Sequence, residues 1–315
     1  RRTGGLDTEC VLLLRDAVTQ NFDRKDTMIR MNIKRKDSTV KMRRNRSGKV
    51  EYLTFPLLEE TGIVRHLFST RMGGVSEGIF SSMNLSYTRG DDKEAVDENY
   101  RRIAQTLGCE VTDIVCSDQT HTTNIRVVKA EDKGKGILFP KDYTDIDGMI
   151  TNVEGIVLAT FYADCVPLFF VDTKRRAVGL SHSGLRGTAG RMGARTIEAM
   201  GREYGTRPED VVAAIGPSIC RDCYEVSKDV ADIFLREFDK PGQDKAILDE
   251  KGGGKYQLDL WEANRIVLLE AGVPMEHIQV TDICTCCNPF FLFSHRASQG
   301  KRGNLGAFLG LLPVN

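Results

Sequence analysis

The sequence predicts an α+β fold in which buried strands and amphipathic helices follow one another within one large domain. Strand and helix signals alternate from Tyr52 onward. Residues 155–171 form a nearly continuous apolar run, which is typical of a strand buried on both faces. A second buried strand, Ala177–His182, is followed by glycines and by a helical pattern from Thr188 to Tyr204. With 315 residues, 41% of them hydrophobic, the chain can bury a substantial core.

The first 50 residues differ in composition from the rest, and we expect residues 1–50 to form a basic extension. Glu9–Val18 has the pattern of a short amphipathic helix. Nine lysines or arginines and a single acid, Asp37, stand between Arg30 and Lys49. This pattern favours a flexible or edge-strand segment with solvated charge, and an arm for acidic partners is the alternative. Residues 51–315 contain no repeat or low-complexity linker, so we expect one domain there.

Local patterns predict the remaining elements in chain order. Val64–Arg71 reads as a strand that runs into a glycine-rich turn at residues 72–78. Asp91–Leu107 is predicted to be a helix, because acids favour its start and its apolar residues share one face. Beyond Tyr204 the patterns predict strands at 211–215, 277–280, 290–293 and 306–311, helices at 227–238 and 259–271, and a loop tip at 252–254.

Charge and cysteine content exclude several classes of function. Lys+Arg and Asp+Glu both total 44, so there is no basic field to attract nucleic acid. No apolar run approaches the roughly 18–20 residues that span a membrane, and no secretion signal is evident. The nine cysteines are an odd number and are crowded near residue 285, which favours reduced thiols over disulfides. We therefore expect a cytoplasmic protein that binds neither nucleic acid nor membranes.

Three side chains in glycine- and aspartate-rich settings form the main candidate site. They are His121, Cys165 and His182, and the whole chain has only five histidines. One thiolate and two imidazoles suit a catalytic zinc, which keeps a fourth position open for water or substrate. The same groups can make a nucleophilic Cys–His pair for an amide or ester hydrolase. Taken singly, each residue is as readily explained as a buried thiol or a hydrogen-bonded core histidine.

Copper chemistry is a further alternative for the same three residues. A His₂Cys set is what a blue copper site needs, together with a weak axial ligand such as methionine. A laccase also needs a trinuclear copper cluster, and five histidines are too few for both. The residues favour zinc, with copper as an adventitious or alternative metal.

Five more cysteines offer a second candidate metal site. Cys220 and Cys223 form a Cys-x-x-Cys pair, and Cys284, Cys286 and Cys287 are crowded together. A structural zinc needs four thiolates. Plain thiols are the favoured interpretation, since nothing in the sequence requires the two groups to meet, and the question stays open at this point.

Two arginines stand where an anion is easily bound. Arg71 follows a strand and precedes two glycines, so its guanidinium is placed to form two parallel hydrogen bonds with phosphate. Arg186 stands at the expected helix start near Gly187, where backbone N–H groups are unpaired. Asp164 precedes Cys165 and is a candidate to orient a ligand or relay a proton. Asp145 and Asp147 are compatible with turn positions, which we favour for Asp145.

The chain resembles the YfiH family, also called the laccase-domain or polyphenol-oxidase-like family, over roughly Val64 to Leu311. The resemblance rests on eight ordered groups of residues. They are Phe68–Arg71 with Gly73–Ser76, Met83–Leu85 with Gly90–Asp92, Gln119–His121, Asp145–Met149, Ala163–Pro167, Ser181–Thr188, Gly216–Ile219 with Cys223–Val226, and Cys284–Thr285 with Phe293–Arg296.

The resemblance implies a four-layer sandwich of two mixed sheets flanked by helices, with residues 51–315 as the catalytic domain. It implies zinc on His121, Cys165 and His182. It also implies phosphorolysis of adenosine, inosine, guanosine or methylthioadenosine, and deamination of adenosine. A bacterial member is linked to peptidoglycan-precursor editing, which gives the hydrolase alternative a substrate class.

Three positions depart from the family pattern. Leu185 replaces the usual tryptophan, which is expected to loosen packing around the base or ribose. Ala297 and Asn304 replace arginines, which is expected to weaken phosphate affinity or shift the substrate. These departures also keep open a catalytically weak binding or regulatory protein.

The sequence thus predicts a zinc-dependent purine nucleoside phosphorylase with adenosine deaminase activity, whose partners are purine nucleosides and phosphate. Arg71 and Arg186 are expected to hold phosphate, and Asn84 and Gln119 to bind polar edges of the substrate. The alternatives are a Cys–His hydrolase acting on peptidoglycan precursors and a copper-binding phenol oxidase.

Overall fold

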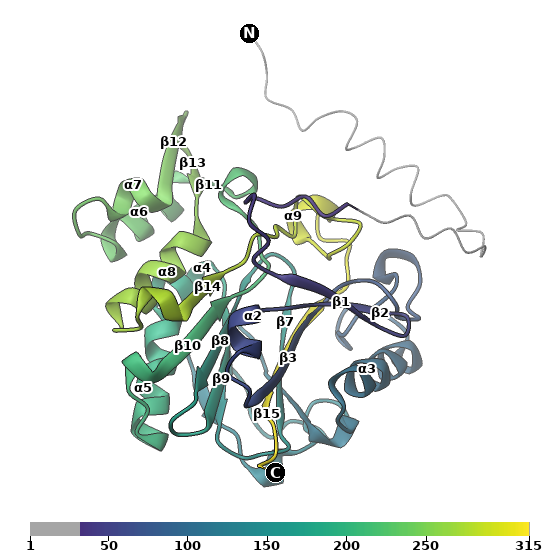
Figure 1. Cartoon of the computed structure of the whole chain (residues 1–315). Coiled ribbons are helices and arrows are strands. Elements are labelled where there is room, and N and C mark those ends of the chain that lie inside the picture. Colours follow the sequence, from purple (N-terminus) through teal and green to yellow (C-terminus); the bar gives the residue numbers. More distant parts are fainter. Residues whose placement is uncertain (1–31, 315) are drawn as a thin grey trace.

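A computed structural model describes residues 32–314. The helix expected at Glu9–Val18 lies outside the described residues. The α+β prediction and its layered arrangement are confirmed: two six-stranded sheets are stacked on each other, and helices cover their outer faces (Figure 1). None of the helices in residues 32–314 is both long and apolar enough to cross a membrane.

The first sheet is mixed and has its C-terminal strand near the middle. Its order is β1 (Arg43–Ser47), β2 (Val50–Thr54), β3 (Val64–Ser69), β15 (Leu305–Leu311), β7 (Val157–Tyr162) and β4 (Ile114–Cys116). Only the β4–β7 pair is parallel. The strand β1 therefore places residues that precede position 51 in the same sheet as the strands of the expected domain.

The second sheet carries most of the candidate site. Its order is β14 (Ile278–Val280), β10 (Val211–Ile215), β8 (Val166–Asp172), β9 (Ala177–Ser183), β6 (Gly148–Thr151) and β5 (Ile125–Val127). The outer pairs β10–β14 and β5–β6 are parallel, and the inner pairs are antiparallel. A small third sheet, β11 (Glu225–Ser227), β13 (Lys255–Leu258) and β12 (Leu248–Gly252), lies apart at one end (Figure 1).

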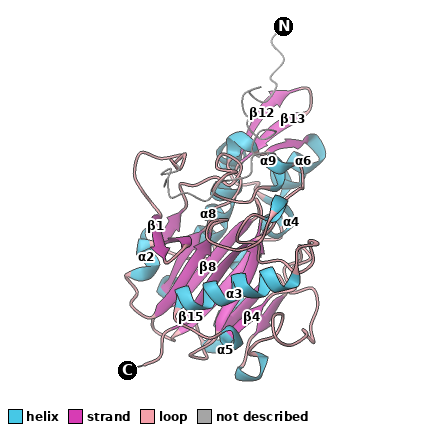
Figure 2. Ribbon diagram, turned by 90° about the vertical axis from the view of Figure 1, so that its right-hand side faces the viewer, coloured by secondary structure: helices cyan, strands magenta, loops and turns pink. Residues whose placement is uncertain are grey.

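Three hydrophobic clusters fill the spaces between the layers. Phe68 and Leu309 of the first sheet pack with Phe169 and Leu180 of the second sheet. The helix α3 (Lys93–Leu107) covers the outer face of the first sheet (Figure 2). The outer face of the second sheet is covered by the helices α5 (Met192–Tyr204), α6 (Lys228–Glu237) and α8 (Leu260–Glu270). The four layers that the family resemblance implies are therefore present.

Four shorter α-helices and six 3₁₀ turns complete the described residues. The four α-helices are α2 (Pro56–Glu59), α4 (Leu185–Ala189), α7 (Gln243–Ile247) and α9 (His295–Ser298), and the 3₁₀ turns include η6 (Met275–His277). The side chain of Asp92 caps α3 by accepting a hydrogen bond from the Ala95 N–H group, and Gly108 ends the helix in the left-handed region with a φ of 66°. The helix expected at Asp91–Leu107 is confirmed.

Three predictions for individual elements were wrong. The apolar run at 155–171 is two strands, β7 and β8, in different sheets, because Asp164 adopts a φ of 87° and turns the chain between them. The helix expected from Thr188 to Tyr204 is divided into α4 and α5 at Arg191, whose φ is 58°. Residues 290–293 form turns rather than a strand, although Phe291, Leu292 and Phe293 are buried in the core.

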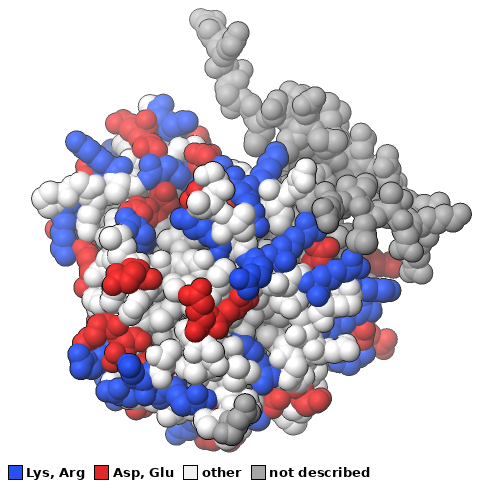
Figure 3. All heavy atoms as spheres, viewed as in Figure 1, with Lys and Arg blue, Asp and Glu red and all other residues white. Residues whose placement is uncertain are grey.

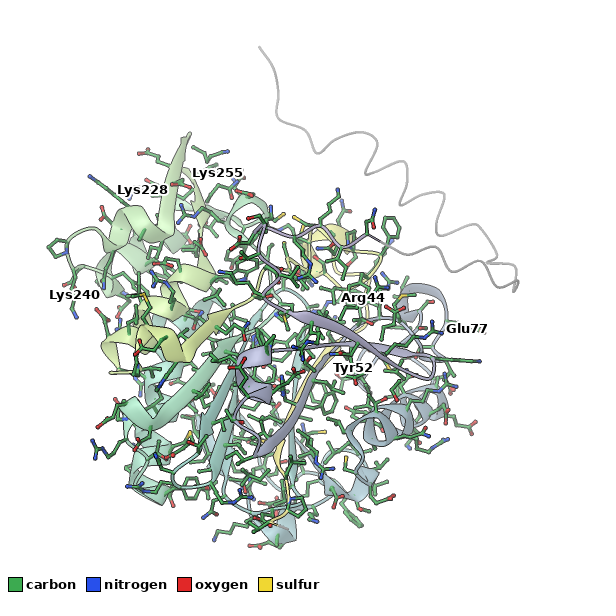
Figure 4. The ribbon with its side chains drawn as sticks, viewed as in Figure 1. Arg44, Tyr52, Glu77, Lys228, Lys240 and Lys255 are labelled. Atoms are coloured by element: carbon green, nitrogen blue, oxygen red, sulfur yellow. The ribbon has the colours of Figure 1, made fainter. Side chains whose placement is uncertain are left out.

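The outer surface shows no concentration of one charge on the face that Figure 3 displays. Basic and acidic side chains are interspersed there, as the balanced composition suggests. Arg44 of β1 lies with its guanidinium 5.0 Å from the ring centre of Phe291, so the strand is fastened to the C-terminal turn region (Figure 4). Lys228 and Lys255 lie at the far end of the molecule, around the third sheet (Figure 4).

Acidification between pH 6.5 and 4 is expected to destabilise the protein through His66 of β3. This histidine is buried against Phe55 and Phe169, and its Nε2 atom accepts a hydrogen bond from the Phe55 N–H group. Burial lowers its pKa from 6.5 to about 4. The unfolded chain therefore binds more protons as the pH falls, and up to about 3 kcal/mol of stability present above pH 6.5 is lost toward pH 4.

Urea unfolding at several pH values measures this effect. His66→Phe is expected to be less stable at pH 7 but to lose less stability between pH 6.5 and 4. His277→Phe, on the short η6 turn, serves as the matched control. An unchanged pH dependence in His66→Phe contradicts the prediction.

Candidate metal centre

The side chains of His121, Cys165 and His182 converge from three elements. His121 lies in the loop after β4, Cys165 in the turn between β7 and β8, and His182 in β9. Their ligand atoms all lie within 4.8 Å of one another, and His121 Nε2 is 4.0 Å from Cys165 Sγ. Because the β7–β8 turn joins the two sheets, the three side chains lie where one sheet passes into the other.

His182 is held in one orientation by a buried carboxylate. Its Nδ1 atom lies 2.7 Å from Asp147 Oδ1, so the Nε2 atom is left for the cluster. Asp147 also accepts hydrogen bonds from the N–H groups of Thr120, His121 and Thr122. Carboxylates of this kind fix the tautomer of metal-binding histidines. The sequence is compatible with a turn position for Asp147 but favours one only for Asp145, and the sole signal for Asp147 is its position within the Asp-Ile-Asp-Gly segment.

The buried carboxyl of Asp147 remains ionised despite its environment. Burial disfavours the charge, but the hydrogen bonds from His182 and from the Thr122 N–H group outweigh it and lower the pKa of Asp147 to about 2. A negative charge is therefore fixed behind the His182 ring at neutral pH. Such a charge makes the imidazole a stronger donor to a cation.

The surroundings of Cys165 favour the thiolate form of its side chain. Burial disfavours the charged thiol, but the imidazoles of His182 and His121 outweigh it and lower the pKa of Cys165 to about 6. Burial also opposes protonation of His182, while Cys165 and Asp147 raise its pKa to about 9. The thiolate is the form of cysteine that binds metals and attacks electrophiles.

The three donors fit a zinc ion in number, type and spacing. Zinc accepts one sulfur and two nitrogens, with bonds of about 2.3 and 2.0–2.1 Å, and catalytic sites use three protein ligands. The backbone beside the donors is also close: a Cβ atom on Gly184 would lie 2.9 Å from Cys165 Sγ and 3.3 Å from His121 Cδ2. The glycine leaves the room that the converging ligands need.

Asp164 fastens the turn that carries Cys165. Its carboxylate accepts hydrogen bonds from Thr285 Oγ1 at 2.6 Å and from the Arg296 N–H group at 2.7 Å. Its own carbonyl accepts a hydrogen bond from the Ile219 N–H group. Asp164 is therefore a positioning residue that joins Cys165 to two distant segments.

The predicted phosphate-binding arginines have different surroundings. Arg71 Nε donates to the Ser81 carbonyl and Nη1 to the Pro289 carbonyl, and its guanidinium lies over the Phe293 ring. Burial lowers the pKa of Arg71 to about 10. The Arg186 side chain in α4 is exposed, and no ion pair to it is found within residues 32–314.

The two predicted substrate-binding amides are engaged with the backbone. Asn84 is fully buried, donates to Asp91 and the Ser86 carbonyl, and accepts from the Asn304 N–H group. Gln119 pairs with both backbone groups of Phe161, accepting at 2.6 Å and donating at 2.8 Å. Gln119 therefore fixes the loop leading to His121, and the predicted contacts of both amides with substrate stay predictions.

A basic group that sequence reasoning missed lies beside the cluster. The Nε atom of Arg302 is buried and has no hydrogen-bond partner in the part of the chain that the structure describes. Burial and the positive charge of Arg89 lower the pKa of Arg302 to about 10, against the opposing charges of Asp164 and Cys165. His295, whose pKa burial and Arg302 also lower, belongs to the same group. Arg89 precedes α3, whereas His295 begins α9 and Arg302 lies in the segment after that helix, so no local pattern could reveal that they meet beside Cys165.

Comparisons with known proteins identify one family for this chain and relatives that are named as nucleoside enzymes. A family model described as "Multi-copper polyphenol oxidoreductase laccase" matches residues 65–312. "Purine nucleoside phosphorylase YlmD" of Geobacillus stearothermophilus is 39% identical over 243 residues, which cover 77% of this chain and 88% of that protein. "Adenosine deaminase RL5", from an unknown prokaryotic organism, is 34% identical over 231 residues, 73% of this chain and 87% of its own.

A solved structure agrees with the fold. The crystal structure of the Bacillus licheniformis hypothetical protein YfiH superimposes with a TM-score of 0.79 at 34% sequence identity. The match covers 86% of this chain and 98% of that one.

Proposed function

The chain belongs to the multi-copper polyphenol oxidoreductase laccase family, and on this premise we propose that it is a zinc-dependent purine nucleoside phosphorylase that also deaminates adenosine. The observation that carries the proposal is the convergence of His121, Cys165 and His182. Each of the two activities appears in the name of a relative whose alignment covers more than 70% of this chain.

His121, Cys165 and His182 would hold the metal, which when bound supplies Lewis acidity toward an oxygen of water or substrate. Asp147 keeps the Nδ1 proton of His182 in place, so that Nε2 remains a lone-pair donor. Gly184 keeps the space beside Cys165 free of a side chain.

The two reactions place different demands on the site. In phosphorolysis, a phosphate oxygen forms a bond to ribose C1′ while the bond from C1′ to the purine nitrogen breaks, and the base leaves with the electron pair. In deamination, water adds at C6 and ammonia leaves. Only phosphorolysis needs a bound anion, so residues that hold phosphate are expected to affect that reaction alone.

We assign phosphate binding to Arg302, assisted by Arg89 and His295. Arg302 and Arg89 are two like charges, and neither forms an ion pair within the described residues 32–314. Bringing such charges together beside Cys165 is unfavourable until an anion joins them. Phosphate is a suitable anion because guanidinium groups bind its oxygens through paired hydrogen bonds. The arginines lost at positions 297 and 304 would thus be replaced in part by Arg302.

Incubation of the zinc-loaded protein with adenosine, with and without phosphate, tests the proposal. Adenine that forms only with phosphate, together with ribose 1-phosphate, is the expected result, and inosine in both conditions reports the deaminase. The absence of adenine, inosine and hypoxanthine in both conditions would overturn the proposal. Inosine, guanosine and methylthioadenosine are compared in the same assay to rank the substrates.

The low pKa of Cys165 favours a second candidate, a Cys–His hydrolase acting on amide or ester bonds such as those of peptidoglycan precursors. The two candidates differ in their response to metal removal. A chelator is expected to abolish nucleoside turnover, and added zinc to restore it, whereas a hydrolase of this kind retains its activity. A third outcome is a copper enzyme that consumes oxygen while it oxidises phenols. The five histidines of the chain are too few for the copper cluster of such an enzyme.

Replacing Arg302 by alanine is expected to raise the KM for phosphate by about 10- to 100-fold, because a charge-assisted hydrogen bond contributes about 1.5–3 kcal/mol. Phosphate-independent deamination should change little, which distinguishes loss of phosphate contacts from a general structural defect. Arg302→Lys is expected to recover part of the affinity. Arg71→Ala and Arg186→Ala in the same assay test the two arginines that the sequence predicts, and an unchanged phosphate KM in Arg302→Ala would refute the assignment.

A further inference from the structure

A second group of cysteines lies together, away from the three proposed catalytic ligands. The Sγ atoms of Cys220, Cys223, Cys284 and Cys287 are all within 4.8 Å of one another. We propose that these four thiolates form a structural zinc site, which holds together the loops that position the Asp164–Cys165 turn. The proposal does not depend on the nucleoside chemistry, because it concerns a different set of ligands.

The distances fit a tetrahedral zinc site better than disulfides. Cys220 Sγ and Cys287 Sγ are 4.0 Å apart, and Cys223 Sγ and Cys287 Sγ are 3.5 Å apart. Zinc–sulfur bonds of about 2.3 Å in a tetrahedron separate the sulfurs by about 3.8 Å. A disulfide requires about 2.05 Å, and the eight described cysteines are all free.

The sequence spacing is that of a zinc site assembled from two halves. Each half is a Cys-x-x-Cys pair, residues 220–223 after β10 and residues 284–287 after β14. This spacing is common in four-cysteine zinc sites. The halves are 61 residues apart in the chain, but β10 and β14 are adjacent parallel strands, and Ser218 pairs with Cys284 in an isolated bridge. The two adjacent strands therefore place both cysteine pairs at the same edge of the sheet.

Backbone and side-chain charges support thiolates at this position. The N–H groups of Cys220 and Cys287 both point at Cys284 Sγ, at 3.3 and 3.4 Å. The ammonium of Lys36, which pairs with Asp222, interacts electrostatically with the Cys220 and Cys287 thiols. Four thiolates around one Zn²⁺ leave two negative charges, which such donors and a nearby cation offset.

The fifth thiol of the region gives an internal comparison. Cys286 is next to Cys287 in the chain but is not a member of the four-sulfur group. It is half-buried, like Cys223 and Cys287. Substituting Cys286 therefore changes a neighbouring thiol of similar exposure without removing a proposed ligand.

The four cysteines are linked directly to the catalytic turn. Thr285, which lies between two of the proposed ligands, donates from Oγ1 to Asp164 at 2.6 Å. The Ile219 N–H group, next to Cys220, donates to the Asp164 carbonyl at 3.0 Å. Asp164 immediately precedes Cys165. A metal that fixes residues 218–223 and 284–288 thus also fixes the backbone from which Cys165 projects.

Zinc content of the purified full chain tests the proposal. The wild-type protein is expected to contain about two zinc equivalents, and His121→Ala about one. X-ray absorption at the zinc edge of His121→Ala should show four sulfur neighbours at about 2.3 Å. Zinc-free His121→Ala, or zinc with nitrogen or oxygen neighbours, would overturn the four-cysteine assignment. This variant leaves the cysteine loops intact, so the result does not depend on the folding of a cysteine variant.

Cysteine substitutions provide the second arm of the experiment. Cys284→Ser in the His121→Ala background is expected to lose the remaining zinc, whereas Cys286→Ser and Cys109→Ser in that background keep it. Loss of zinc from Cys286→Ser equal to that from Cys284→Ser would contradict the ligand set. Two zinc equivalents in a wild-type protein without nucleoside turnover would support the structural site while refuting the proposed function.

Discussion

His182→Ala is expected to lose both phosphorolysis and deamination and to retain only about one zinc equivalent, that of the four-cysteine site. The substitution removes one of three proposed ligands and also leaves the buried carboxylate of Asp147 without its imidazole partner. Changes to partners of metal ligands already cost about 10- to 100-fold in metal affinity or activity, so loss of the ligand itself should cost at least about 100-fold. Product formation from adenosine and zinc content by elemental analysis measure the two effects.

The matched control for this substitution is His277→Ala. His277 lies on η6, outside the proposed metal group, and its replacement is expected to leave turnover and zinc content unchanged. Full activity in His182→Ala with both zinc equivalents present would rule out the proposed centre. A variant that loses activity but keeps two zinc equivalents would show that His182 acts in some way other than binding the metal.

Asp147→Asn is expected to weaken zinc binding at the His121–Cys165–His182 centre by about 10- to 100-fold. The carboxylate accepts hydrogen bonds from the N–H groups of Thr120, His121 and Thr122 and lies against His182 Nδ1. An amide has one acceptor oxygen and one donor nitrogen, so in either orientation an NH₂ group faces other donors. Both the loop that carries His121 and the tautomer of His182 are then less well defined.

Competition with a chromophoric chelator measures this change in zinc affinity. Asp145→Asn is the matched control, because the carboxylate of Asp145 accepts one hydrogen bond, from Thr120 Oγ1, at an exposed position. The control is expected to bind zinc almost as tightly as the wild type. Equal affinities in Asp147→Asn and the wild type would contradict the role assigned to the carboxylate.

The sequence predicts those parts of this molecule that local patterns determine. The helix at α3 follows from its acidic start and its apolar face, and the grouping of His121, Cys165 and His182 was expected from their similar settings. The apolar run at 155–171 shows the limit of such reasoning. Hydrophobicity indicates burial, but it does not reveal that a left-handed Asp164 sends the two halves into different sheets.

The remaining features depend on contacts between distant parts of the chain. The four cysteines meet because β10 and β14 pair side by side, and nothing near Cys220 or Cys284 in the sequence indicates that pairing. Arg302 likewise acquires its surroundings from loops far away in the sequence. The sequence left the role of Asp147 open, and only the position of β9 beside β6 shows that it faces His182.

The central place of β15 in the first sheet has a consequence for synthesis on the ribosome. This strand, Leu305–Leu311, is made after every other strand of that sheet, yet it pairs with β3 on one side and β7 on the other. Until it emerges, the nascent chain can form only the β1–β2–β3 and β4–β7 portions of that sheet, each with an unpaired edge. Removing Leu305–Leu311 would therefore divide the sheet in two, and the growing polypeptide depends on protection from aggregation until this strand has been made.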